Sequence, residues 1–296
     1  MKILVTGGAG FIGSHFCELA VSAGHEVTVL DNFSFGNREW LPKRVQIHEA
    51  SILDYSACVA ATHGVDAVVH LAAMSRSGPS IEKIEECSSI NEFGTLNVLR
   101  ASKANGVRKF VYSGSATFYG NQAAPQTVGM ASDLLNPYGL TKHIGELWTA
   151  MFSRVYDLNT TVLRFFNVYG PRQPNDGVYG LVIGMFLRAA ASGEPLSIHG
   201  DGSQRRDFIH VRDVARAILA SLDFETSGKT FNVGSGQNYS VKQIADLISD
   251  RQIFGPRREG DAEVTLANIE ETEKMLDWSP EITLETGVRE LVVETP

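Results

Sequence analysis

Two residues one helical turn apart, Tyr138 and Lys142, are of the types that could act together as a base. Asn136-Pro137 precedes them, and this dipeptide is typical of a helix that begins with an N-cap asparagine and a proline at its first position. Tyr138 and Lys142 then lie at i and i+4 on one face of that helix. A lysine one turn away could lower the pKa of the phenol from its usual ~10. The same spacing is also common on ordinary helix surfaces, so the interpretation as a general base needs a second signal.

A glycine-rich turn near the start of the chain supplies that signal. Gly7, Gly10 and Gly13 lie between an apolar run at 2–6 and a helical pattern that begins near Ser14. Glycines permit a tight turn, and the helix N-terminus can face a pyrophosphate. Asp31 ends the next apolar run, about 20 residues later, where a carboxylate can accept hydrogen bonds from both ribose hydroxyls. A carboxylate also repels a 2′-phosphate, so the sequence predicts NAD and not NADP. An oxidised nicotinamide would lower the pKa of the phenol further.

The elements that position these residues alternate along the first half of the chain. Short runs rich in β-branched residues predict strands at 2–6, 26–30, 45–48, 67–71, 109–113 and 160–165. Amphipathic stretches between them predict helices, notably at 87–105 and 138–156. Continuous apolar strands separated by helices favour a doubly wound parallel α/β sheet of the Rossmann type. Such a sheet binds its ligand at the carboxyl ends of the strands.

The regular alternation of strands and helices ends after residue 166. It is interrupted by Gly170-Pro171, Gln173-Pro174 and Gly200-Asp201-Gly202. We therefore expect a smaller C-terminal substrate domain that is partly interleaved with the sheet. The predicted division assigns residues 1–170 and 207–236 to the NAD-binding domain. Residues 171–206 and 237–296 form the predicted substrate region.

The overall composition excludes several classes of function. The net charge of −8 offers no excess of lysine and arginine to neutralise nucleic-acid phosphates. The three cysteines have no paired or metal-like spacing, and the eight histidines follow no metal-binding pattern, so we expect no metal and a reducing, cytoplasmic compartment. No apolar run approaches 18 residues, so we expect no membrane span.

Taken together, these residues resemble the extended short-chain dehydrogenase/reductase family, and within it the nucleotide-sugar epimerases of the UDP-glucose/UDP-galactose type. The resemblance covers nearly the whole chain. The segments that carry it are Thr6-Gly7-Gly8-Ala9-Gly10-Phe11-Ile12-Gly13, Leu30-Asp31-Asn32, His70-Leu71-Ala72-Ala73, Asn91, Ser113-Gly114-Ser115-Ala116-Thr117, Tyr138-x-x-x-Lys142, Arg164-Phe165-Phe166-Asn167-Val168-Tyr169-Gly170, Arg206-Asp207-Phe208 and Arg258-x-x-Asp261.

The resemblance implies roles for residues on the catalytic and cofactor side. Ser115 completes a Ser-Tyr-Lys triad and hydrogen-bonds the reacting oxygen of the sugar, with Thr117 as a helper. Asn91 supports the helix that carries Lys142. The implied cofactor-binding set is Gly7, Gly10, Phe11, Ile12, Gly13, Asp31, Asn32, Ile52, Leu71, Ala72, Ala73, Asn91, Ser113, Tyr138, Lys142 and Phe165.

The resemblance also implies a site for a nucleotide-diphosphate sugar, UDP-linked by analogy. Asn167, Arg206 and Arg258 would grip the diphosphate, and guanidinium groups do bind phosphate oxygens bidentately. Arg205 and Arg257 are their neighbours, and the motif position favours Arg206 and Arg258. The other implied substrate contacts are Asp261 at the ribose, Ser197 and His199 in the segment 196–199 beside the base, and Thr265 beside the C2 substituent of the sugar, where a small residue admits an N-acetyl group.

The residues after Ser115 bear on the type of reaction. The resembling 4,6-dehydratases carry an Asp-Glu pair there, whereas this chain has Ala116-Thr117, neither of which can protonate a leaving group. The sequence therefore favours 4-epimerisation through a 4-keto intermediate. A dehydratase or a 4-reductase remains the alternative, and a non-catalytic NAD-binding protein is a further one that the presence of Tyr138 and Lys142 disfavours.

Some features depart from the resembling family. Ser51 replaces an aspartate that hydrogen-bonds adenine, and the sequence leaves open whether Asp54 substitutes for it. Ser75-Arg76 replaces a segment with a lysine. The linker between the helix at 241–249 and Arg258 is short, which suggests that a strand of the substrate region is absent.

The resemblance also implies a homodimer. Its interface would be formed by the helices at 87–105 and 138–156. Its core would be Leu96, Leu99, Trp148 and Phe152 unless they pack on the sheet.

Overall fold

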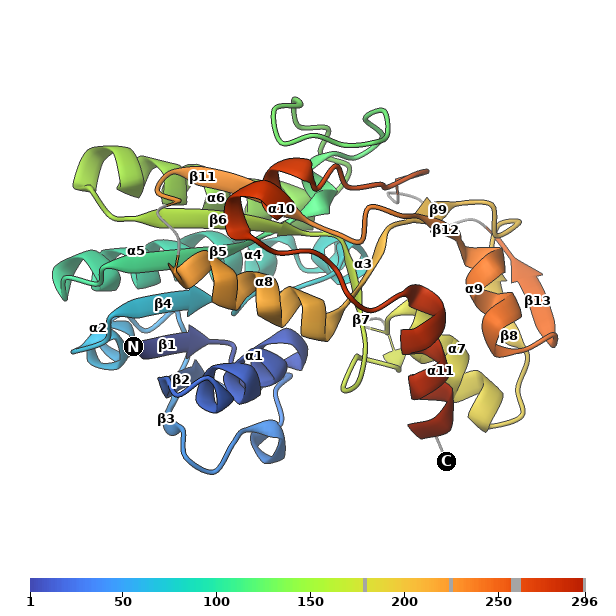
Figure 1. The fold of residues 1–296 in the computed structure, drawn as a ribbon, viewed down its shortest axis with the longest axis horizontal. Helices are drawn as coiled ribbons and strands as arrows, with labels where there is room; N and C mark the ends of the chain where they lie inside the picture. The colour runs from blue at the N-terminus through green and yellow to red at the C-terminus, as the bar shows by residue number, and fades with distance from the viewer. Residues whose placement is uncertain (178–179, 224–225, 257–261, 295–296) are drawn as a thin grey trace.

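A seven-stranded parallel sheet forms the centre of the molecule (Figure 1). The computed structural model describes residues 1–177, 180–223, 226–256 and 262–294. The strand order is β11-β6-β5-β4-β1-β2-β3, so the direction of winding reverses between β1 and β4. The strands are β1 (Lys2–Thr6), β2 (Glu26–Asp31), β3 (Gln46–Glu49), β4 (Ala67–His70), β5 (Lys109–Ser115), β6 (Thr160–Phe165) and β11 (Lys229–Val233).

Helices cover both faces of this sheet and create two cores. On one face α1 (Phe11–Ser22) packs beside α8 (Val211–Asp223), and on the other lie α2 (Tyr55–Thr62), α5 (Thr95–Ala104) and α6 (Pro137–Tyr156). The side chains of β1 show the alternation that builds both cores, because Ile3 and Val5 belong to the first and Leu4 to the second. The predicted doubly wound α/β fold is therefore confirmed.

Several element boundaries differ from the sequence-based prediction. Helix α1 begins at Phe11, directly after the glycine turn, and not near Ser14. The helix expected at 87–105 consists of α4 (Ile84–Ser88), a π-helical turn η2 (Ser89–Gly94) and α5. Strand β11 was missed, because its short run Lys229–Val233 follows a long excursion of the chain.

Two residues predicted at a dimer interface lie in the interior instead. Leu99 and Phe152 are buried in the core between the sheet and its helices, at 0% and 3% exposure. This part of the prediction is wrong, because both side chains face the sheet and only their helices reach the surface. Leu96 and Trp148 are partly buried against the same core.

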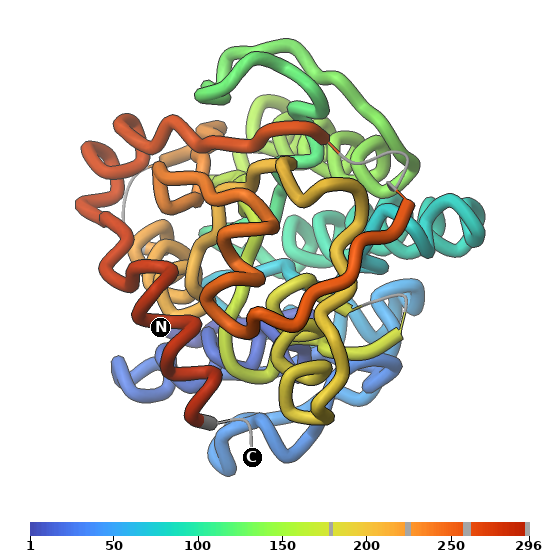
Figure 2. The backbone as a smooth tube through the Cα atoms, turned by 90° about the vertical axis from the view of Figure 1, so that its right-hand side faces the viewer, coloured from blue at the N-terminus to red at the C-terminus, as the bar shows by residue number. Residues whose placement is uncertain are grey.

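The C-terminal region lies beyond the carboxyl ends of the strands, in front of the sheet in the view of Figure 2. It has its own core, built from the strand β8 and three helices together with Tyr169 and Phe208. The elements of this region are α7 (Val182–Ala191), β8 (Leu196–His199), β9 (Arg205–Arg206), β12 (Tyr239–Ser240), α9 (Val241–Ile248), β13 (Gln252–Gly255) and α11 (Leu284–Glu294).

The short linker before Arg258 contains a strand after all. β13 pairs in parallel with β8 immediately after α9, which corrects the expectation that a strand is absent there. The remaining elements are η1 (Arg38–Trp40), α3 (Ser77–Glu82), η3 (Ala116–Phe118), β7 (Asn167–Tyr169), β10 (Phe208–His210) and α10 (Glu270–Leu276).

The predicted division into domains stays a prediction. Within the segment 237–296, Leu276 at the end of α10 and Trp278 pack into the sheet core beside α8. The same segment supplies α9 and α11 to the separate C-terminal core. The chain therefore passes back and forth between the two cores.

Candidate active site

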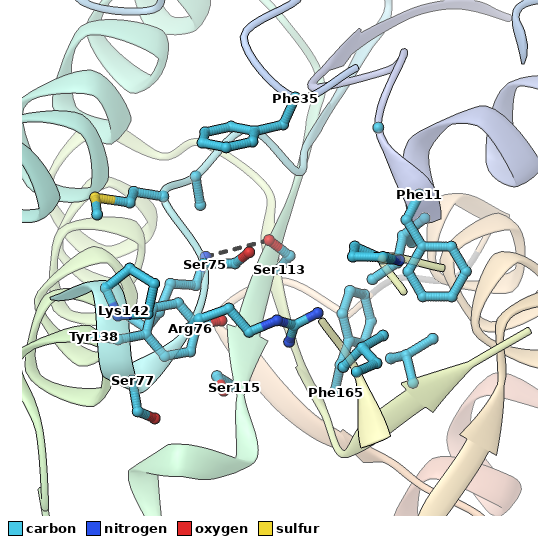
Figure 3. A pocket seen from close by; sticks show the side chains of 18 of the residues that line it. Phe11, Phe35, Ser75, Arg76, Ser77, Ser113, Ser115, Tyr138, Lys142 and Phe165 are labelled. Atoms are coloured by element: carbon cyan, nitrogen blue, oxygen red, sulfur yellow. Dashed lines mark hydrogen bonds between the residues drawn. The ribbon is translucent and has the colours of Figure 1, made fainter. Parts of the chain in front are cut away.

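A cavity of about 1400 Å³ lies where the carboxyl ends of the strands face the C-terminal region. Residues from the glycine turn line one end of it, and residues of β7, β8 and β9 line the other. Figure 3 shows Tyr138, Lys142, Ser115, Ser113 and Phe165 around its centre. This is the place where a doubly wound sheet with its switch point between β1 and β4 is expected to bind a ligand.

The glycine turn leaves no room for side chains at two positions. Gly7 has φ +69°, and a Cβ atom there would lie 2.7 Å from the backbone nitrogen of Ala72. A Cβ atom on Gly13 would lie 2.2 Å from the carbonyl oxygen of Gly7. The backbone of β1 thus turns tightly into α1, and the helix N-terminus faces the cavity. The N–H groups of such a terminus suit a pyrophosphate.

Asp31 is both part of the cavity wall and part of the turn that forms it. Its Oδ2 accepts a hydrogen bond from the backbone N–H of Ala9 at 3.0 Å, and its Oδ1 accepts one from Phe33 at 2.8 Å. Burial raises the pKa of the Asp31 carboxyl, and these two hydrogen bonds oppose the rise. Each carboxylate oxygen has a second lone pair for a ribose hydroxyl. The glycine cradle and this carboxylate fit the adenosine diphosphate half of NAD.

The start of α6 fixes the position of Tyr138. Asn136 caps the helix, because its Oδ1 accepts a hydrogen bond from the N–H of Gly139 at 2.9 Å, and Pro137 follows at the first position. The backbone N–H of Tyr138 donates to Ser80 Oγ at 3.0 Å. Asn91, almost fully buried below the cavity, donates to Thr141 Oγ1 at 2.9 Å and so ties η2 to α6. The predicted cap is confirmed.

Lys142 lies one turn further along α6, with its ammonium group buried. Its Nζ donates to Ser113 Oγ at 3.3 Å and sits 4.4 Å from the centre of the Tyr112 ring, on its face. Burial lowers the pKa of Lys142 from 10.5 to about 7. A cation held over an aromatic face in this way is attracted by the ring quadrupole. The contact fixes the lysine in the cavity wall beside Tyr138.

The largest influence on the pKa of the Tyr138 phenol is burial, not Lys142. Burial raises the pKa of Tyr138 above its usual value of 10, because a phenolate loses hydration there. A hydrogen bond with Ser115 and the guanidinium of Arg76 are what lower it. That Lys142 lowers the pKa of the phenol therefore stays a prediction.

Ser115 and Thr117 form a small hydroxyl relay at the end of β5. Thr117 donates through its Oγ1 to Ser115 Oγ at 2.9 Å, and its backbone N–H donates to the same oxygen at 3.3 Å. Because Ser115 Oγ accepts both bonds, its own proton is left to be donated towards Tyr138 or a bound oxygen atom.

The predicted substrate residues lie at the opposite end of the cavity. Arg206 lines it, with its Nη1 donating to the carbonyl oxygens of Arg205 and Glu263. Arg205 instead donates to Asn238 and does not line the cavity, so the structure distinguishes the two arginines as the motif did. The other predicted lining residues of this end are Asn167, Ser197, His199 and Thr265.

Two predicted substrate residues, Arg258 and Asp261, lie outside the described residues. Among the residues predicted to bind the cofactor, Asn91 alone does not line the described cavity wall. It lies behind the wall, where it bonds to Thr141 of α6. Ser51 lines the cavity, whereas Asp54 caps α2 by accepting from the N–H of Ala57 at 3.1 Å. Asp54 therefore does not replace the missing adenine-binding aspartate.

The sequence reasoning missed one charged side chain in the cavity. Arg76 reaches into its centre from the turn after β4, between Tyr138 and Phe165 (Figure 3). The segment Ser75-Arg76 stood out only as a departure from the resembling family. Its inward direction depends on a backbone φ of +99°, which no sequence pattern predicts for an arginine.

In the described part of the chain, no group of three or more histidine, cysteine, aspartate or glutamate side chains is arranged to hold a metal ion. No helix within the same residues is both long and apolar enough to cross a membrane.

Comparisons with known proteins agree with this geometry. Residues 3–234 match the NAD dependent epimerase/dehydratase family. A UDP-glucose 4-epimerase of Corynebacterium glutamicum is 36% identical, over 96% of this chain and 92% of the relative. The solved UDP-glucose 4-epimerase of Thermotoga maritima with UDP-glucose is 34% identical, with a TM-score of 0.95 over 100% of this chain and 98% of that one. MoeE5 in complex with UDP-glucuronic acid and NAD is 28% identical, with a TM-score of 0.92 over 100% of both chains.

Proposed function

The chain belongs to the NAD dependent epimerase/dehydratase family, and on that premise we propose that it is an NAD-dependent 4-epimerase of nucleotide-linked hexoses, of the UDP-glucose/UDP-galactose type. One observation carries the proposal most directly. Tyr138, Ser115 and Lys142 meet in the same cavity as the glycine turn, Asp31 and Arg206. A base, a dinucleotide cradle and a diphosphate clamp are the parts that this reaction needs.

The cofactor would lie along the wall between the glycine turn and Tyr138. The N-terminus of α1 would hold its pyrophosphate, Asp31 would accept from the adenosine ribose, and Phe165 would pack at the nicotinamide end. When bound, NAD⁺ accepts a hydride from the sugar and later returns it. The same wall includes Ile52, Leu71 and Ala72, which exclude water with their apolar atoms.

Tyr138 is the proposed base that takes the proton from the 4-hydroxyl group of the sugar. Ser115 Oγ accepts a hydrogen bond from Thr117, so its own proton can be donated to the reacting oxygen. This bond would hold the oxygen against the phenol. Lys142 and its contact with Ser113 keep positive charge beside the site. A bound oxidised nicotinamide would add a cation that lowers the pKa of the phenol, which offsets the effect of burial. Tyr138 returns the proton after the 4-keto sugar has turned over.

The diphosphate of the substrate would be held at the far end. Arg206 supplies a guanidinium that suits phosphate oxygens, and Asn167 and Thr265 lie beside it. Ser197 and His199 of β8 would lie against the base, UDP-linked by analogy with the relatives. Arg258 and Asp261 remain proposed contacts on motif position alone. A clamp at this end leaves the sugar able to rotate about its bond to the diphosphate.

The wall after Ser115 favours epimerisation over the alternatives within the family. Ala116 and Thr117 line the cavity and neither can act as an acid. A 4,6-dehydratase needs an acid there to expel water, and a 4-reductase gives a net redox change. A non-catalytic NAD-binding protein has no need of the assembled Tyr138, Ser115 and Lys142.

The test is to incubate the purified protein with UDP-galactose in the presence of NAD and to resolve the products by configuration at C4. We expect UDP-glucose to form with no net accumulation of NADH. Loss of water would identify a dehydratase, a stoichiometric redox change would identify a reductase, and no conversion of any UDP- or dTDP-linked hexose would exclude the proposed function.

Thr265 is proposed to admit a bulky substituent at C2. It is buried at the cavity wall and accepts from the N–H of Asp207 at 3.1 Å, so a small side chain fills this position. We expect the wild type to convert both UDP-galactose and UDP-N-acetylgalactosamine. In Thr265→Tyr the ratio of kcat/KM for the acetylated to the plain sugar should fall at least ~10-fold, a typical cost of a lost fit in a pocket. Initial rates on the two sugars measure this ratio. An unchanged ratio in the variant would mean that Thr265 does not control which C2 substituent is accepted.

We also propose a homodimer formed through α6 and the segment η2–α5. A groove between them has an almost entirely apolar wall that includes Phe93, Leu96, Leu147 and Trp148. Phe93 is 63% and Leu147 56% exposed in the single chain, which is unusual for large apolar side chains that cluster.

Light scattering at micromolar concentration tests the dimer. The wild type should have the mass of two chains, and Leu147→Glu should have the mass of one because a charge would be buried in the interface. Phe254→Glu, which changes a comparably exposed apolar side chain on β13, is the matched control and should stay dimeric. A monomeric wild type would contradict the proposal.

A cytoplasmic location is proposed as well. All three cysteines are free and buried in the sheet cores or behind α6. Unpaired cysteines are usual where the compartment is reducing. Fractionation of cells that express the protein, followed by immunoblotting, tests the location.

A further inference from the structure

Arg76 is held in the cavity by a strained backbone. It lies between β4 and α3, and its φ of +99° and ψ of 135° are rarely adopted by a residue with a side chain. Such a conformation is strained and persists where the surroundings impose it, commonly at functional sites. Its effect here is to turn a long cationic side chain inward, away from the solvent outside α3.

The guanidinium of Arg76 lies at the reacting end of the cavity. Figure 3 shows it extending from beside Tyr138 towards Phe165, with Ser115 below it and Ser113 above. Its charge acts on the phenol, since it lowers the pKa of Tyr138. A sugar whose 4-hydroxyl group reaches Tyr138 and Ser115 would therefore place the substituents next to C4 within reach of Arg76.

The described charges at this end of the cavity are mainly positive. Arg76 and Lys142 are its cations, and an oxidised nicotinamide would bring one more. The described carboxylates of the cavity wall lie elsewhere. Asp31 is bonded to the backbone of the glycine turn, and Glu82 and Glu86 are exposed at the rim, the latter paired with Lys83 at 3.1 Å.

We propose that Arg76 binds a carboxylate carried by the sugar itself, at C6, so that the preferred substrates are nucleotide-linked hexuronates and not neutral hexoses. This inference rests on the proposed 4-epimerase function and narrows its substrate. C6 is attached to C5, the ring carbon next to C4, so the carboxylate lies close to the reacting atom. Arg76 would be a specificity-determining residue that itself neither takes nor gives the proton.

The chemistry of the guanidinium supports a carboxylate partner. Arginine presents a planar fork of N–H donors that matches a carboxylate bidentately. Burial lowers the pKa of Arg76 from its usual value, but an arginine stays charged at neutral pH. A desolvated charge gains more from an ionic partner than from a hydroxyl group, because the surroundings screen the attraction less. The carboxylate would also offset the positive charge of Lys142 and of the nicotinamide.

The experiment compares UDP-glucuronate with UDP-glucose in the NAD-loaded enzyme and measures kcat/KM for 4-epimerisation of each. The wild type should prefer UDP-glucuronate. Arg76→Met should lower the ratio of the two values at least ~30-fold, as expected when one partner of a buried charge pair is removed. Arg76→Lys keeps the charge and loses the planar pair of donors, so its ratio should lie between those of the wild type and of Arg76→Met. Arg289→Met, at an exposed arginine of α11 that is not part of the cavity wall, is the matched control and should leave the ratio unchanged.

The outcomes separate this inference from the proposed function. Epimerisation of UDP-glucose with a lower kcat/KM for UDP-glucuronate would overturn the inference and leave the function intact. An unchanged ratio in Arg76→Met would also overturn it, and so would release of carbon dioxide from UDP-glucuronate in place of its 4-epimer. No epimerisation of either sugar, nor of any other, would overturn the function. Because the ratio is taken within one variant, a loss of folded protein does not affect it.

Discussion

We expect the Tyr138→Phe enzyme to epimerise its nucleotide sugar at least ~10²-fold more slowly than the wild type, which is the lower range for removal of a general base. The substitution deletes one oxygen atom and keeps the ring, so the cap at Asn136 and the bond from the Tyr138 N–H to Ser80 remain. The loss should appear in kcat. Affinity for NAD and for UDP should change less than a few-fold, because neither depends on the phenol oxygen alone.

Initial rates and equilibrium titration of NAD and UDP measure these quantities. Tyr156→Phe, at an exposed position on the same helix, is the matched control and should keep the wild-type rate. Turnover of Tyr138→Phe close to that of the wild type would mean that another group takes the proton.

The second large effect is expected at Asp31. Asp31→Ala removes the proposed ribose acceptor and also leaves the buried N–H of Ala9 and the part-buried N–H of Phe33 without their partner. Each orphaned group costs about 1–3 kcal/mol, so both stability and NAD affinity should fall, the latter at least ~10²-fold. The preference for NAD over NADP should narrow at the same time, because the repulsion of a 2′-phosphate disappears.

Calorimetric titration with both dinucleotides and thermal unfolding measure the two effects separately. Asp54→Ala is the matched control, because Asp54 caps α2 outside the cavity. It should lose about 1 kcal/mol of stability and keep its affinity for NAD. If wild-type protein bound NADP as tightly as NAD, the assignment of Asp31 to the ribose would fail.

The parts of the site that could be predicted are those encoded locally. The glycine turn, the carboxylate at the end of β2 and the capped start of α6 each follow from residues close together in the sequence, and the structure places all three at one cavity. Their meeting also follows, because parallel strands present their carboxyl ends at one edge.

The parts that failed depend on tertiary contacts. The charge acting on Tyr138 comes from Arg76, far away in sequence, through a backbone conformation that sequence does not reveal. Leu99 and Phe152 are apolar residues of the kind that also form interfaces. Only their packing against the sheet shows that they belong to the core. Strand β11 has only two large apolar residues, Phe231 and Val233, and its pairing with β6, far back in the chain, is a tertiary contact.

That pairing of β11 with β6 has a consequence for how the protein is made. During synthesis β6 emerges from the ribosome long before β11, since residues 166–228 separate the two strands. Until Val233 has left the exit tunnel, β6 is a bare outer strand, with unpaired N–H and C=O groups that invite association with other nascent chains. Most of the C-terminal core is translated in the same interval and later. The last step in completing the sheet is therefore the pairing of two strands that are far apart in the sequence. Until then the exposed edge of β6 is where a chaperone would bind.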